Sequence, residues 1–199
     1  MIPLISTLIF TPIIGGVIVF LLGRVSVKAT RIGSLIISLI VMILSIYMYG
    51  VILQNGSGGV YNFVEGPYHW IPALKGLDYY VGVDGLGAPL TVISAILTVL
   101  VVLGSWDLIS THEPIYYALI LIFEGTIIGV FTSLNLILFY VFWDIVLIPM
   151  FFFIGVWGGP NRRYAAMKFL IFTFVGSVVM LLGFIALYIF ATPSGNFNI

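Results

Sequence analysis

The 199-residue sequence contains no cysteine, only two histidines and few charged residues. Without cysteine, this chain carries no disulfide, no iron–sulfur cluster and no thiolate metal site. His69 and His112 fall in segments that we expect to be loops, so we expect neither a haem inside a helical bundle nor another metal or cofactor site here. The formal net charge is zero, so neither a nucleic acid nor an acidic partner is indicated.

Charged residues make up 7% of the chain and hydrophobic residues 62%. Soluble domains carry about 25% charged residues, and a soluble fold of this length could not cover so much apolar surface with polar atoms. The alternating strand pattern of an outer-membrane barrel is missing as well. We therefore expect an all-α fold, a polytopic transmembrane helix bundle.

Six apolar segments reach the roughly 20 residues that a helix needs to cross the hydrocarbon core of a bilayer. They divide the chain into two N-terminal helices within 1–53, an aromatic-rich interfacial loop at 54–83, and helices three to six within 84–199. The six helices are expected near residues 2–23, 32–53, 84–106, 114–132, 135–157 and 165–191.

Basic residues predict the orientation of these helices, because cytoplasmic loops carry an excess of Lys and Arg. With six crossings, the connection between helices one and two lies on the same side as the connection between helices five and six. Six basic residues lie at that side and one lies at the other. The N-terminus and the loop 54–83 are therefore predicted to lie outside. The six residues are Arg24, Lys28, Arg31, Arg162, Arg163 and Lys168, and the single one is Lys75.

Asp144 lies in the middle of the apolar segment 135–157. A carboxylate at such a depth is costly to keep charged, and ionisable residues inside membrane helices are functional by default. The alternative is a structural role, in which a protonated acid bonds to a neighbouring helix. Pro149 removes one backbone hydrogen bond of the same helix and leaves either a kink or a free carbonyl for water, or it serves packing alone.

Glu124 is central to the preceding segment, 114–132, too far from either end to reach the membrane surface. Two midplane carboxylates on consecutive helices indicate an ion pathway. The alternative is again structural, because Gly125 and Gly129 indicate close helix packing that would satisfy a neutral acid.

Lys168 lies about a turn inside the sixth helix, where it either extends to the inner surface or has a buried role. Thr173 and Ser177 follow at helical spacing and either hold water or bond to their own helix.

Asp84 stands where the third helix begins, and we expect it to cap free amides there. Three polar residues are expected to be solvated in the short loop between helices three and four, namely Asp107, His112 and Glu113.

Five motifs lie between about residue 80 and residue 190. They are Gly-Val-Asp-Gly-Leu at 82–86, Leu-Phe-Tyr-Val-Phe-Trp at 138–143, Leu-Ile-Pro-Met at 147–150, Gly-Val-Trp-Gly-Gly-Pro at 155–160, and Arg-Tyr-Ala-Ala-Met-Lys-Phe at 163–169. Together they resemble the proton-pumping subunit M of NADH–quinone oxidoreductase, called chain 4 in mitochondria. The same superfamily includes subunits of multisubunit cation/proton antiporters and of membrane-bound hydrogenases.

The resemblance implies that the carboxylate after the Phe-Trp pair, Asp144, is essential for pumping. The family usually has Glu there, and its usual partner, a lysine on the seventh helix, is missing from this chain. Family members have about fourteen helices, so we expect this chain to be the N-terminal part of a longer subunit rather than the product of a split or truncated gene.

The expected function is that of a membrane proton-translocating subunit in a complex I-type dehydrogenase, which couples electron transfer to quinone or a related carrier to proton export. Asp144 would load and release protons, with Glu124 and Lys168 as relay or charge-coupling partners. Flavin, iron–sulfur clusters and quinone are expected on partner subunits, among them neighbouring antiporter-like subunits. The expected location is the cell inner membrane, or the equivalent membrane of an organelle. The alternatives are a subunit of a cation/proton antiporter or membrane-bound hydrogenase, and a truncated scaffold that does not pump.

Overall fold

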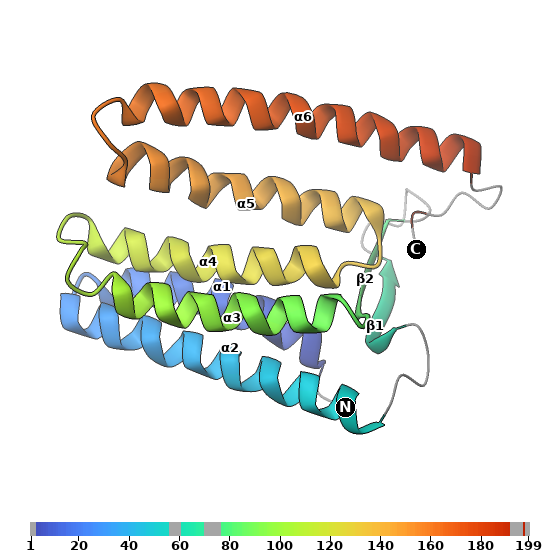
Figure 1. Ribbon diagram of the computed structural model, residues 1–199, viewed down its shortest axis with the longest axis horizontal. Helices are drawn as coiled ribbons and strands as arrows, with labels where there is room; N and C mark the ends of the chain where they lie inside the picture. Colours follow the sequence, from blue (N-terminus) through green and yellow to red (C-terminus); the bar gives the residue numbers. More distant parts are fainter. Residues whose placement is uncertain (1–2, 56–60, 70–76, 192–196, 198–199) are drawn as a thin grey trace. The chain divides into compact units, whose positions relative to one another are not determined.

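A computed structural model of the chain describes residues 3–55, 61–69, 77–191 and 197. Within these ranges the chain forms six helices and two strands (Figure 1). Each helix is long and apolar enough to cross a membrane, which confirms the predicted polytopic bundle. The outside position of the N-terminus stays a prediction, and Lys75 lies outside the described residues. The helices are α1 (Leu4–Leu22), α2 (Val27–Asn55), α3 (Gly87–Gly104), α4 (Glu113–Thr132), α5 (Leu136–Trp157) and α6 (Arg162–Ala191).

The helix α2 begins five residues earlier than predicted, because its first turns accept charged residues. Lys28 and Arg31 therefore belong to the helix and not to the preceding connection. The amide and the hydroxyl of Thr30 both donate to the carbonyl of Ser26, at 3.2 Å each. Long basic side chains can leave a helix end toward the membrane surface, so charge alone did not mark where the helix starts.

The segment 54–83 contains a two-stranded sheet where we expected a loop. Strand β1 (Asn62–His69) pairs with strand β2 (Asp78–Val83), and the His69 Nδ1 and Asp78 Oδ1 atoms are 2.6 Å apart. His69 is thus the last residue of a strand. Gly66 and Pro67 interrupt the apolar pattern of β1, and strand pairing depends on contacts that a local sequence pattern does not show.

The described residues divide into two compact units, and each is described by itself. Unit 1 comprises Met1–Val64 and Gly82–Thr132 and holds α1 to α4. In this unit α1 packs on α2 and α4, and α3 packs on α2 and α4. The α1–α2 turn and the α3–α4 connection lie at the same end of the unit (Figure 1).

Glycines bring α1 and α4 into close contact. A Cβ atom on Gly125 would lie 2.5 Å from the carbonyl oxygen of Ile9, and one on Gly16 would lie 2.8 Å from the carbonyl oxygen of Ala118. Helices in membranes associate through such small residues because the backbones can then approach closely. The close packing predicted at Gly125 is confirmed.

Unit 2 comprises Glu65–Val81 and Ser133–Ile199, and its helices α5 and α6 pack together as a hairpin. The residues before α5 are held by β2, because the Leu134 amide donates to the Tyr80 carbonyl at 2.9 Å. The side chain of Asn135 then caps α5, accepting from the amides of Ile137 and Leu138 at 3.1 and 3.2 Å. These contacts fix where α5 begins and thereby the depth of its acidic residue.

Candidate functional site

Asp144 lies near the middle of α5 and accepts a hydrogen bond from the hydroxyl of Ser177 on α6. Asp144 is half-buried, and Ser177 is 2% exposed. The two residues meet because α5 and α6 form a hairpin and each lies a similar number of residues from the connection between the helices. The carboxylate therefore has a protein partner on the neighbouring helix.

Ser177 was not recognised from the sequence as the partner of Asp144. Its spacing from Thr173 indicated only a polar position on the sixth helix. Thr173 does bond to its own helix, through the carbonyls of Phe169 at 2.7 Å and Leu170 at 3.2 Å. Counting outward from the hairpin connection would have placed Ser177 opposite the acid.

Pro149 adds a second polar feature beside Asp144. It lies inside α5 and is buried. Proline has no amide hydrogen, so the carbonyl of Ile145 lacks its usual donor four residues later. A carbonyl freed in this way lies next to Asp144 in the sequence and can accept a hydrogen bond from water or from another side chain.

Lys168 is not brought to Asp144. It lies nine residues before Ser177 on α6, which is about 13 Å along a helix axis. The side chain is exposed, and its Nζ lies 5.9 Å from the centre of the Tyr164 ring. Among the described residues, no carboxylate forms a salt bridge with Lys168.

Glu124 lies inside unit 1, 1% exposed. Neither of its carboxyl oxygens has a hydrogen-bond partner among the described residues. The structural alternative predicted that close packing at Gly125 would provide the acid with a hydrogen-bond partner. The helices do pack closely at Gly125, but no described residue bonds to the carboxyl group of Glu124. A buried polar group without a hydrogen-bond partner is costly, which keeps Glu124 a candidate functional residue.

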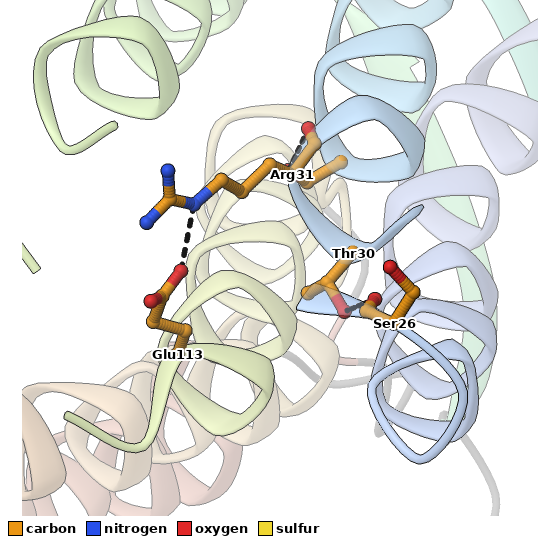
Figure 2. A network of polar contacts seen from close by, with 5 residues as sticks. Ser26, Thr30, Arg31 and Glu113 are labelled. Atoms are coloured by element: carbon orange, nitrogen blue, oxygen red, sulfur yellow. Dashed lines mark hydrogen bonds and ion pairs between the residues drawn. The ribbon is translucent and has the colours of Figure 1, made fainter. Parts of the chain in front are cut away.

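Glu113 corrects a prediction, because it is not solvated in a loop. It is the first residue of α4 and is 9% exposed. Its Oε2 accepts a hydrogen bond from Nε of Arg31 on α2 at 2.7 Å, which forms an ion pair at one end of unit 1 (Figure 2). Asp107 and His112, by contrast, are exposed as expected.

Tyr117 follows Glu113 one turn later on α4 and is fully buried. Its hydroxyl has no hydrogen-bond partner in the described part of the chain. No local pattern distinguishes this tyrosine from the other ten in the chain.

Asp84 caps α3 as predicted. Its Oδ1 accepts from the amide of Gly87 at 2.6 Å, and its carbonyl accepts from the amide of Ala88 at 3.2 Å. In the described ranges, no three His, Asp or Glu side chains gather closely enough to hold a metal ion.

The family described as NADH:quinone oxidoreductase/Mrp antiporter, TM, matches residues 133–198 of this chain. NADH-quinone oxidoreductase subunit M of Rickettsia prowazekii is 39% identical over 189 residues, which are 94% of this chain and 38% of the relative. F(420)H(2) dehydrogenase subunit M of Methanosarcina mazei is 38% identical over 190 residues, which are 94% of this chain and 37% of that relative.

A chain in the structure of respiratory complex I from Thermus thermophilus with bound NADH superposes with a TM-score of 0.78 at 24% identity. The match covers 98% of this chain and 38% of that chain. At this identity the likeness shows a shared fold. The chain spans about 38% of the length of the two curated relatives described above.

Proposed function

Because this chain belongs to the NADH:quinone oxidoreductase/Mrp antiporter family of membrane subunits, we propose that it translocates protons within a complex I-type dehydrogenase. Electron transfer to quinone or a related carrier would drive the export. The redox groups, flavin and iron–sulfur clusters, would lie on partner subunits, and neighbouring antiporter-like subunits would flank this chain in the membrane.

The hydrogen bond between Ser177 and Asp144 carries this proposal. A hydroxyl donates to an ionised carboxylate and can turn to accept from a protonated one. The same contact therefore serves both states of Asp144. An acid that must alternate between the two states inside a membrane needs a partner of this kind, since leaving either state unpaired is costly.

Glu124 is the proposed relay acid of unit 1, because it is buried and its carboxyl oxygens are free of hydrogen bonds to the described residues. Lys168 is proposed as a charge-coupling residue and not as a direct partner. Its exposed side chain is on α6, nine residues before Ser177. Lys168 would therefore influence proton movement through its positive charge and not through a hydrogen bond to Asp144.

The dehydrogenase assignment is preferred to a free-standing cation/proton antiporter. The two relatives described above are named as subunits of an oxidoreductase and of a dehydrogenase, although the family description also includes antiporters. Coupling of proton movement to electron transfer distinguishes the two, because an antiporter would exchange a cation for protons without a redox substrate.

Substitutions of Ser177 in the assembled complex test the proposal. Ser177→Ala removes the hydroxyl, whereas Ser177→Thr keeps one. We expect slower proton pumping by the Ala variant at an unchanged level of assembly, and recovery toward the wild-type rate in the Thr variant. Thr173→Ala is the matched control, since within the described ranges this hydroxyl bonds only to carbonyls of its own helix. Equal pumping by the Ser177→Ala variant and the control would refute the role of the contact.

A further inference from the structure

One buried face of α4 carries a row of polar groups that leads away from the Arg31–Glu113 ion pair. Glu113, Tyr117 and Glu124 recur at intervals of four and seven residues, so they share one side of the helix. All three are buried. The Tyr117 hydroxyl and both carboxyl oxygens of Glu124 have no hydrogen-bond partner among the described residues. Two such groups on one face are unusual, because each costs free energy.

The helix α2 presents a row of hydroxyl groups inside the same unit. These residues recur at intervals of four and seven, and each is fully buried. Each hydroxyl donates to a backbone carbonyl three or four residues earlier in the chain, at 2.8–3.2 Å. A hydroxyl that donates still has lone pairs that accept a hydrogen bond. The residues are Thr30, Ser34, Ser38 and Ser45.

The ion pair fixes the register of the two rows. Arg31 lies near the start of α2 and Glu113 is the first residue of α4, and the two helices pack together. Both helices therefore run from this end of the unit in the same direction (Figure 1). At 1.5 Å per residue, Tyr117 and Glu124 lie about 6 and 16 Å beyond Glu113 along the axis, and Ser38 lies about 10 Å beyond Arg31.

Ser38 thus lies at a height between the two unpaired groups of α4. The axial gap of about 10 Å between Tyr117 and Glu124 is too long for one hydrogen bond. The Ser38 hydroxyl, about halfway along, divides this gap into two shorter distances, each of which a single water molecule can bridge.

We propose that these two rows face each other and form a proton-access path from the Arg31–Glu113 end of unit 1 to Glu124. This inference rests on the proposed function, because it takes Glu124 to exchange protons. A proton taken up by Glu113 passes along water, the Tyr117 hydroxyl and the Ser38 hydroxyl. Each hydroxyl accepts one proton and releases another, so no group on the path is changed after the transfer. Arg31 holds the Glu113 carboxylate at the start of the path.

Hydrogen–deuterium exchange at Glu124 tests the path without relying on pumping. The assembled complex in membranes is transferred to D₂O, at a pH where the protonated carboxyl band of Glu124 is present, and infrared spectroscopy follows the shift of that band. The Glu124→Gln variant identifies the band by its loss. We expect Ser38→Ala and Tyr117→Phe each to slow the exchange about tenfold, the effect of one lost hydrogen bond of ordinary strength.

Two controls match these changes in chemistry and differ in position. Ser94→Ala removes a hydroxyl on α3 that also bonds to its own helix, at 2.9 Å. Tyr116→Phe removes the neighbouring phenol, which lies 2.9 Å from the Ser105 hydroxyl. Both controls should exchange at the wild-type rate. If Tyr117→Phe impairs assembly, Ser38→Ala still decides the matter.

Pumping by Glu124→Gln separates failure of the path from failure of the proposed function. If this variant pumps poorly but Ser38→Ala and Tyr117→Phe leave the exchange rate unchanged, the path is refuted and the relay role of Glu124 stands. If the two variants slow exchange while Glu124→Gln pumps normally, the path is supported and the relay role is refuted.

Discussion

Replacing Gly125 by alanine tests the close packing that positions the buried acid of unit 1. The added Cβ would lie 2.5 Å from the carbonyl oxygen of Ile9 and 2.6 Å from Cγ1 of Ile13. The first of these is a backbone atom, so it cannot move aside as a side chain does. Real Cβ contacts are essentially never shorter than 3.0 Å, and α1 and α4 must therefore separate locally by at least 0.5 Å.

The expected cost follows from two opposing effects. A gap of 0.5–1 Å forfeits about a quarter to a half of the dispersion attraction of the atoms that line it, and overpacking of a well-packed site typically costs about 1–3 kcal/mol. Glycine to alanine inside a helix otherwise gains about 1 kcal/mol. The overpacking is the larger effect, so Gly125→Ala should lower the stability of the assembled complex.

Thermal denaturation of the solubilised complex, followed by native gel electrophoresis, measures this change. Gly176→Ala on α6 is the matched control, because a Cβ there meets nothing within 4 Å. The control should be as stable as the wild type or slightly more stable. Equal denaturation midpoints for the two variants would refute the close approach of α1 and α4.

Two further predictions concern the charges of unit 1 and the orientation of the helices. Arg31→Ala and Glu113→Ala should destabilise the complex non-additively, because each single change already removes the ion pair. The double variant should be about as stable as either single variant. Additive losses of stability in a double-mutant cycle would mean that the ion pair contributes nothing. Single cysteines introduced at Ser26 and Asn161 should be labelled from the cytoplasmic side only, and one introduced at Ser57 from the outside only, as the excess of Lys and Arg predicts. Labelling of the cysteines at positions 26 and 57 from the same side would exclude the predicted topology.

Hydropathy was sufficient to predict the six helices, because a membrane span must satisfy its own backbone and remain apolar for about 20 residues. The depth of Asp144 and of Glu124 followed directly from these spans. The cap at Asp84 was also predictable, since it depends on residues that are close in the sequence.

Contacts between distant segments were harder to predict. Glu113 resembled a loop residue because its partner, Arg31, lies 82 positions away in the sequence. The pairing of β1 with β2 depends on the sheet and not on either strand alone. Ser177 was not identified as the partner of Asp144, although counting residues outward from the connection between the fifth and sixth helices would have placed it opposite the acid.

The number of protons pumped per electron by Asp144 variants tests the central claim most directly. In the intact complex, Asp144→Asn should lose most of its pumping while assembly is retained, because an amide cannot take up and release a proton. Asp144→Glu should be tolerated, since it keeps the titratable carboxyl group, and Asp107→Asn, at an exposed acid, should behave as the wild type. A wild-type ratio of protons to electrons in the Asp144→Asn variant would contradict the proposal that this residue carries the proton.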